Sequence, residues 1–320
     1  MAGAAGSGLD WAMLERRGRL MEAIRAYFSA AGVLEVDTPM LRRTCASDPH
    51  IPETPVQRMG EQPAYLQSSP EALLKCLVAE HGRPIYQLGH VYRAGEVGHW
   101  HQPEFLMLEW YRPGWGMQAL MDEVLAVLRL AAPALESATA LCDWGRCFEQ
   151  QTGVPADSTP AVLRERAGQL GFSAELTGAL DAGGLRDLLF SHCVQPMLGR
   201  DGPQFVTGFL ADDASFARLD PEHPERALRF EVYWKGVELA NGGEELTDAS
   251  VWRQRASRDH AERRARGAAP IPLDTDWQRA LEQGLPACSG VALGVDRLLM
   301  LAAGADSIQA VVPFASSEAT

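Results

Sequence analysis

The chain has 320 residues, 46% of them hydrophobic, which is enough to bury the core of one large domain or of two smaller ones. Its formal net charge of −13 argues against a broad nucleic-acid surface, because such a surface carries an excess of Lys and Arg. No apolar run approaches the roughly 18 residues of a membrane span, and the first residues do not look like a signal peptide, so we expect a cytoplasmic protein with a loose tail at residues 1–10.

The cysteines contain no C-x-x-C pair. This spacing favours reduced thiols over a disulfide framework or a zinc site. The six residues concerned are Cys45, Cys76, Cys142, Cys147, Cys193 and Cys288.

In the first half of the chain, apolar residues at helical spacing predict a helix over residues 14–31, ended by Gly32, and a short strand up to Pro39 follows. Ser69 and Pro70 are typical of a helix start, and the helix they predict ends before Gly82. Two strands, 84–93 and 104–111, then precede a helix over 116–132.

In the second half, residues 141–225 are rich in Gly, Pro and Asp, which we interpret as an insertion rather than a separate catalytic unit. Residues 229–242 predict a hairpin that turns at Lys235 and Gly236. An Arg-rich helix is expected at 248–266, and a strand entering a helix at 288–304. Because the strands come in hairpins rather than βαβ units, we expect an α+β fold with a largely antiparallel sheet flanked by helices.

The strand 104–111 carries a carboxylate among apolar residues. Alternation places Phe105, Met107, Glu109 and Tyr111 on one face. A buried carboxylate is costly without a partner, so Glu109 either forms a structural ion pair or binds a cation. Arg93, just before this strand's loop, is either solvated or positioned to fork onto a phosphate or carboxylate.

The 229–242 hairpin carries Glu231 and Glu238 almost symmetrically about its turn. Two close carboxylates repel unless a cation lies between them, and oxygen ligands of this kind suit Mg²⁺ that bridges substrate phosphates. The alternative is a charged hairpin that faces solvent.

A third candidate lies at 289–299, where Gly290 and Gly294 permit close backbone approach and Arg297 opens a helix. Such a segment can form a nucleotide platform, although it is not the G-x-G-x-x-G of a dinucleotide fold. His99 and His101 have no third ligand at metal spacing, so we expect them in a loop that closes over a ligand.

Three segments in order, "GVLEVDTP" (32–39), "VYRAGE…HQPEFLMLEWY" (91–111) and "GVALGVDRLL" (290–299), resemble motifs 1, 2 and 3 of class II aminoacyl-tRNA synthetases. "SSPEALLKCL" and "GVELANGGEELTDA" are similar to the lysyl branch. Within that branch the chain resembles the elongation factor P–(R)-β-lysine ligase family. Motif 1 begins at residue 32, which leaves no room for an anticodon-binding domain, and Ala292 stands where lysyl-tRNA synthetases carry glycine.

The resemblance implies one class II catalytic domain over 11–320, with 141–225 inserted between motifs 2 and 3. It implies that Arg93 holds the α-phosphate of ATP and Arg297 the γ-phosphate, with Glu231 and Glu238 as Mg²⁺ ligands. The other implied nucleotide contacts are Ala94, Gly95, Glu96, Gln102, Glu238, Leu239 and Gly294. The implied substrate contacts are Ser69, Pro70, Glu71, Glu109, Tyr111, Asn241, Glu245 and Ala292.

Motif 2 departs from the usual pattern, because Gly95 stands where synthetases carry a glutamate. Either Glu96 substitutes through a shifted loop, or Gly95 supplies only backbone. Gln102 replaces a usual asparagine and keeps its amide.

The function implied by the resemblance is ATP-dependent activation of (R)-β-lysine or lysine as an adenylate, followed by transfer to a lysine of elongation factor P. We expect a homodimer, with no membrane and no tRNA as partner. Two alternatives are a truncated lysyl-tRNA synthetase-like enzyme with another small acceptor, and an inactive paralogue that binds lysine or nucleotide.

Overall fold

The computed structural model describes residues 7–44, 51, 53–59, 62–135, 140–267 and 271–316. The chain divides into two compact units, which are described separately. Unit 1 comprises Met1–Ala134 and Glu244–Thr320, and unit 2 comprises Leu135–Gly243.

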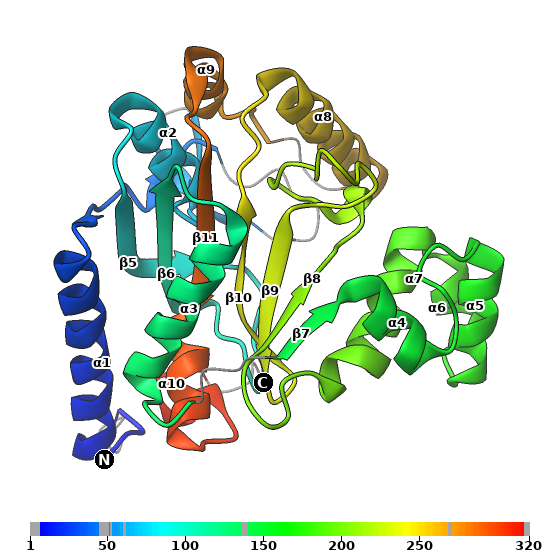
Figure 1. The fold of residues 1–320 in the computed structure, drawn as a ribbon, viewed down its shortest axis with the longest axis horizontal. Coiled ribbons are helices and arrows are strands. Elements are labelled where there is room, and N and C mark those ends of the chain that lie inside the picture. Colours follow the sequence, from blue (N-terminus) through cyan, green and yellow to red (C-terminus); the bar gives the residue numbers. More distant parts are fainter. Residues whose placement is uncertain are drawn as a thin grey trace. The chain divides into compact units, whose positions relative to one another are not determined.

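The main sheet of unit 1 has strand order β1-β5-β6-β11. The strands are β1 (Leu34–Glu35), β5 (Ile85–Tyr92), β6 (Glu104–Pro113) and β11 (Cys288–Gly294). β5 and β11 flank β6 in antiparallel ladders, and β1 runs parallel to β5. The motif 2 and motif 3 strands therefore lie side by side (Figure 1). A small sheet of order β2-β4-β3 contains β2 (Leu41–Arg42), β4 (Gln62–Leu66) and β3 (Thr54–Met59).

The helices that the sequence predicts in unit 1 begin and end within a few residues of their predicted bounds, whereas α9 and η4 were not predicted. Asp10 caps the first helix by accepting from Met13 N, although we expected it in a loose tail, whose residues 1–6 lie outside the described part of the chain. Gly82 closes the next helix in a left-handed conformation. Within the described residues, no helix is long and apolar enough to cross a membrane. The helices are α1 (Trp11–Ala30), α2 (Glu71–His81), α3 (Met117–Ala131), α8 (Ala249–Ala265), α9 (Thr275–Gly284), α10 (Val295–Ala303) and the 3₁₀ turn η4 (Ile308–Ala310).

One face of β6 is fixed by an aromatic and ionic core. Phe28 stacks on Tyr86 at 4.5 Å and meets Trp110 edge-on at 5.4 Å. Glu123 of α3 accepts from Trp110 Nε1 at 2.8 Å and from the Arg112 guanidinium. Because side chains alternate along a strand, this anchoring turns Glu109 and Tyr111 to the opposite face. The predicted grouping of those two residues is confirmed, since the Tyr111 hydroxyl donates to Glu109 at 2.7 Å.

Unit 2 has a sheet of order β10-β9-β8-β7. Its strands are β7 (Ala140–Asp143), β8 (Gln204–Thr207), β9 (Arg229–Trp234) and β10 (Val237–Glu244). The predicted hairpin β9–β10 is confirmed, and Lys235 and Gly236 both adopt positive φ, at 51° and 75°, as a tight type I′ turn requires. All of residues 141–225, the predicted insertion, belong to one compact unit with this hairpin.

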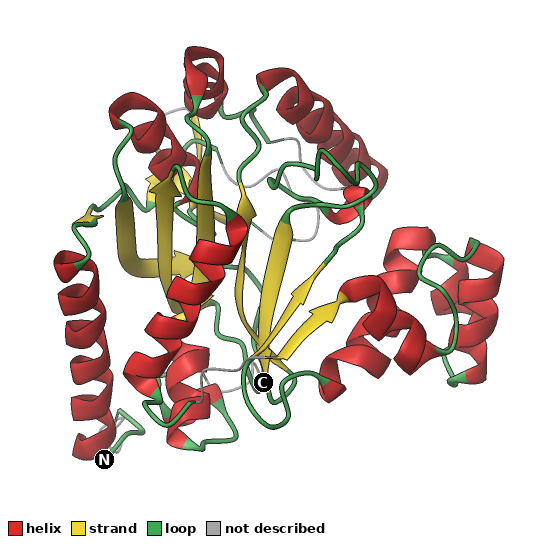
Figure 2. Ribbon diagram, in the orientation of Figure 1, coloured by secondary structure: helices red, strands yellow, loops and turns green. Residues whose placement is uncertain are grey.

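Figure 2 shows the helices of unit 2 in red. They pack on a second core that contains several aromatic residues. Trp144 stacks on Phe148 at 5.2 Å and on Phe190 at 5.6 Å. The helical segments are α4 (Trp144–Thr152), α5 (Pro160–Gln169), α6 (Ala174–Gly178), α7 (Ala182–Leu189), η1 (Phe190–Val194), η2 (Gln195–Met197) and η3 (Ala211–Asp213).

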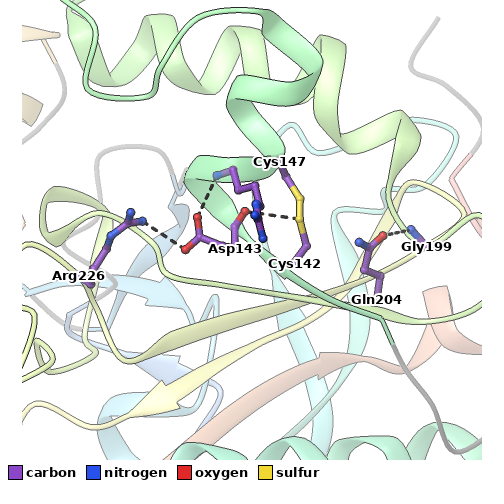
Figure 3. The surroundings of a disulfide bond; sticks show 7 residues. Cys142, Asp143, Cys147, Gly199, Gln204 and Arg226 are labelled. Atoms are coloured by element: carbon purple, nitrogen blue, oxygen red, sulfur yellow. Dashed lines mark hydrogen bonds and ion pairs between the residues drawn. A yellow bond between two sulfur atoms is a disulfide. The ribbon is translucent and has the colours of Figure 1, made fainter.

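A disulfide joins Cys142 and Cys147 at the passage from β7 to α4 (Figure 3), so the expectation of reduced thiols is wrong for this pair. Asp143 caps α4 by accepting from Arg146 N at 2.9 Å, and this turn brings the two Cα atoms to 6.5 Å, within bridging range. Asp143 also pairs with Arg226 at 3.6 Å. Sequence spacing could not reveal the bridge, because a separation of five residues places two side chains together only when such a turn intervenes.

Candidate active site

The centre of the candidate site is a group of acids in unit 1, which we call the carboxylate cluster: the buried Glu109 and Glu245 and the half-buried Glu71, with Lys75 and Tyr111. Glu109 lies on β6 opposite Ala292 of β11, and Tyr111 lies opposite Gly290. The register therefore brings the acid of motif 2 and the predicted selectivity position of motif 3 to one place on the sheet.

The segment Ser69–Glu71 lies against this cluster. The Ser69 hydroxyl donates to Glu109 at 2.7 Å and also accepts from Glu71 N at 3.0 Å. Pro70 precedes the first residue of α2, so the cap lies one residue later than the sequence predicts. The two hydroxyls of Ser69 and Tyr111 thus hold a carboxylate that is only 2% exposed.

Lys75 is the member that we did not predict from the sequence. Its side chain is 1% exposed and pairs with Glu71 and, at 2.5 Å, with Glu245. Its ammonium also lies 5.8 Å from the ring centre of Tyr111 and 5.4 Å from that of Trp277. The sequence did contain a signal for the pairing of Lys75 with Glu71, because these residues are four positions apart on a predicted helix and so share one face.

Burial dominates the electrostatics of the cluster. It raises the pKa of Glu109 to about 8, reinforced by the Glu71 charge and opposed by the Tyr111 and Ser69 hydroxyls and by Lys75. It raises the pKa of Glu245 to about 7 against the opposing effect of Lys75. For Lys75, burial lowers the pKa, but Glu245 and Glu71 outweigh it and the net pKa is raised. The cluster therefore favours cations and takes up protons when none is bound.

Gly290 permits the close approach that this arrangement requires. A Cβ there would lie 2.3 Å from a ring carbon of Tyr111 and 2.6 Å from a carboxylate oxygen of Glu245. Glu245 N donates to Cys288 O at 2.9 Å, which fixes that residue beside β11. Only a glycine leaves room for the tyrosine ring and the second acid at this point of the strand.

The motif 2 loop begins with a turn at Ala94 and Gly95, where Gly95 has φ of 74°. The turn directs the Glu96 carboxylate back to Arg93, at 3.8 Å. The Arg93 guanidinium lies 5.3 Å from the Phe105 ring centre, and its buried Nε finds no hydrogen-bond partner among the described residues. Glu96 therefore pairs with the arginine whose predicted role is phosphate binding.

The same loop is held from motif 3 and from the C-terminal segment. Arg297 Nε donates to Trp100 O at 3.1 Å. Gln102 exchanges two hydrogen bonds with the backbone of Ser316, at 2.8 and 3.2 Å, instead of pointing freely from the loop. Burial lowers the pKa of His101, and the charges of Arg297 and Arg93 add to this effect, so both predicted phosphate arginines act on one side chain.

Unit 2 holds the remaining predicted residues on its hairpin. Glu238 lies opposite Tyr233, and Asn241 opposite Glu231, so the two glutamates share a face but are diagonal rather than directly opposed. Glu231 accepts from the Arg229 guanidinium, from Tyr233 at 2.5 Å and from Asn241 at 3.4 Å.

The hairpin offers two carboxylates to a cation. Burial raises the pKa of Glu231 to about 7; Arg229 opposes this and the Glu238 charge adds to it, so the two glutamates act on each other. Mg²⁺ that bridges phosphates needs only one or two protein carboxylates, so the pair fits such an ion, with Glu231 shared with Arg229. Among the described residues, no group of three or more His, Cys, Asp or Glu could enclose a metal ion by itself.

The predicted site residues thus form three groups, two in unit 1 and one in unit 2. Unit 1 brings together Ser69, Pro70, Glu71, Glu109, Tyr111, Glu245 and Ala292, and separately Arg93, Ala94, Gly95, Glu96, Gln102 and Arg297, with Gly294 ending β11. Unit 2 carries Glu231, Glu238, Leu239 and Asn241.

The site therefore combines a largely antiparallel sheet, an acidic cluster beside β6 and β11, and two arginines at the motif 2 loop, Arg93 and Arg297. The family model described as tRNA synthetases class II (D, K and N) matches residues 11–318, so the chain belongs to this family. The chain is 41% identical over 309 residues to an elongation factor P–(R)-β-lysine ligase of Yersinia pestis (strain Pestoides F), covering 95% of this chain and 94% of that protein. The protein of the same description from Yersinia pseudotuberculosis (serotype O:1b, strain IP 31758) gives the same values.

Proposed function

We propose that this protein is an ATP-dependent ligase that activates (R)-β-lysine or lysine as an adenylate and transfers it to a lysine of elongation factor P. The observation that carries this proposal is the carboxylate cluster, in which a buried lysine pairs with Glu71 and Glu245, and a third acid, Glu109, lies beside them on the motif 2 strand. The family membership and the identity to the Yersinia ligases support the reaction class.

In this proposal the cluster receives the amines of the substrate. Glu109 and Tyr111 lie on one face of β6, and a backbone hydrogen bond from Glu245 to Cys288 holds Glu245 next to them. Ala292, opposite Glu109, presents a methyl group to the same place and so shapes the room for the substrate's carbon chain. Asn241 is the residue we assign to the substrate carboxylate.

In the activation step, a carboxylate oxygen of the amino acid attacks the α-phosphorus of ATP. The bond from that phosphorus to the bridging oxygen breaks, and pyrophosphate leaves. Arg93 would bind the α-phosphate and Arg297 the γ-phosphate, while Gly294 would lie under the adenine. Bound Mg²⁺ would neutralise phosphate charge, held by Glu238 and Glu231. Since no protein nucleophile takes part, catalysis rests on positioning and charge neutralisation.

In the transfer step, a neutral ε-amine of the acceptor attacks the carbonyl carbon of the adenylate. AMP leaves and the nitrogen loses a proton, which gives an amide. The acceptor lysine has to lose its charge first, which desolvation near the site promotes.

The test has two parts. ATP–pyrophosphate exchange should depend on β-lysine or lysine, and mass spectrometry should show elongation factor P gaining one lysyl residue in the presence of ATP. If exchange occurs but lysine tRNA is charged instead of the protein, the truncated synthetase alternative is correct. The absence of exchange with both isomers would exclude the adenylation reaction.

We also propose that the protein is a homodimer. Motif 1 and the residues just after it expose apolar side chains, since Leu34 is 64% exposed and Leu41 is 38% exposed. A second copy would remove these surfaces from water, which is favourable. Light scattering after size-exclusion chromatography should give twice the chain mass, and Leu34→Asp should reduce it to the monomer mass.

A further inference from the structure

The chain has only two lysines, Lys75 and Lys235, and one of them is buried inside the carboxylate cluster. A buried ammonium is costly unless paired, and Lys75 is paired with both Glu71 and Glu245. The protein therefore keeps a fixed cation in the place where a cationic substrate has to bind.

The pairing divides the cluster into two parts of equal charge. Lys75 is shared by Glu71 and Glu245, so this trio has one surplus negative charge when its members are ionised. Glu109 is held by the hydroxyls of Ser69 and Tyr111, and among the described residues no cation lies within ion-pair distance of it. When ionised, Glu109 gives a second surplus negative charge at a separate position.

We propose that Lys75 is a specificity-determining positioning residue, which fixes two singly charged positions that match the two ammonium groups of a diamino acid. This inference rests on the proposed function, and it deepens that function by assigning the selection of doubly charged substrates to a residue outside the predicted contacts. Lys75 acts through Glu71 and Glu245, whose separation it fixes by pairing with both.

Removal of the Lys75 ammonium changes the position at which a substrate ammonium group binds. Without Lys75, the repulsion between Glu71 and Glu245 draws one substrate ammonium between them. Glu109 then lacks its partner, or the pair takes up a proton, and the one negative charge that remains is no longer fixed in position. In either case a diamino acid loses one charged hydrogen bond, which corresponds to about tenfold weaker binding or more.

The experiment compares lysine with norleucine, which has the same chain length but no side-chain ammonium. Calorimetric titration of the wild type, Lys75→Met and Lys235→Met measures binding without ATP. Met preserves most of the buried volume, and Lys235 lies at the exposed hairpin turn, so Lys235→Met is the matched control. Wild type and control should prefer lysine strongly, whereas Lys75→Met should lose about tenfold of that preference or more.

Chemical rescue separates charge from packing. Lys75→Ala lacks the atoms of n-propylammonium, so this ion should restore lysine-dependent exchange, whereas 1-propanol of the same size should not. The KM for lysine should change, and the KM for ATP should stay within about twofold, because the phosphate arginines lie outside the cluster.

The outcomes distinguish the two proposals. An unchanged preference for lysine in Lys75→Met, or a wild type without any preference, overturns the role of Lys75. Equal rescue by propanol also overturns it, because packing would then explain the defect. A wild type that binds lysine selectively but shows no exchange overturns the ligase function alone.

Discussion

Gly290 is the position where one added methyl group tests the carboxylate cluster most directly. The Cβ of Gly290→Ala would lie 2.3 Å from Tyr111 Cε1 and 2.6 Å from Glu245 Oε1. Tyr111 and Glu245 are both buried, and the Tyr111 hydroxyl donates a hydrogen bond to Glu109. Neither side chain can therefore move away without breaking a contact. Overpacking of this kind costs about 1–3 kcal/mol. We expect a Tm lower by several degrees and a KM for lysine raised about tenfold or more, since 1.4 kcal/mol corresponds to a factor of ten.

Thermal unfolding and ATP–pyrophosphate exchange measure the two effects. The matched control is Gly18→Ala, on the exposed side of α1, where an added Cβ meets nothing within 4 Å. This change should be neutral or slightly stabilising, because alanine favours a helix over glycine. If Gly290→Ala unfolds at the wild-type temperature and keeps the wild-type KM for lysine, Tyr111 and Glu245 do not converge on this strand.

Three further results are expected. Gly294→Ala should leave Tm unchanged, because its nearest side-chain atom is Arg297 Cδ at 3.7 Å, but should raise the KM for ATP several-fold; an unchanged KM would contradict adenine packing there. Ala292→Gly should shift the ratio of kcat/KM values in exchange assays toward α-lysine over β-lysine, and an unaltered ratio would mean that the methyl group does not discriminate. The raised pKa values of Glu109 and Glu245 mean that the folded protein without ligand binds more protons than the unfolded chain between about pH 4.5 and pH 8. Stability should therefore fall as pH rises through 7 to 8, and Glu109→Gln should remove part of this loss; a Tm that is flat over this window in the wild type would refute the raised values. Lysine should stabilise more strongly across the same window, because its ammonium groups favour the ionised carboxylates.

The elements with strong local signals were predictable to within a few residues. Asp248 caps α8, and the Lys235–Gly236 turn has the positive φ values that a two-residue hairpin loop demands. Alternation along one strand was enough to place Glu109 and Tyr111 on the same face. These features depend on neighbours within a few residues, and such neighbours are visible in the sequence.

Other features depended on contacts between distant segments. Lys75 looked like an ordinary helix residue, because its partner Glu245 lies 170 positions further on and only the fold brings them together. Gln102 carries an amide that could bind a nucleotide, yet in the structure this amide forms a hydrogen bond with the backbone of Ser316. The bridge between Cys142 and Cys147 likewise followed from the turn capped by Asp143.

The sequence by itself therefore determined the class of fold, the motif order and the identity of most acids and arginines in the candidate site. The tertiary structure decided how those charges are shared: which acid is paired with a buried lysine, which is held by hydroxyls, and which arginine meets Glu96. The physical reason is that the energy of a buried charge depends on its distance from every other charge, and these distances are set by strand register and helix packing rather than by position in the chain.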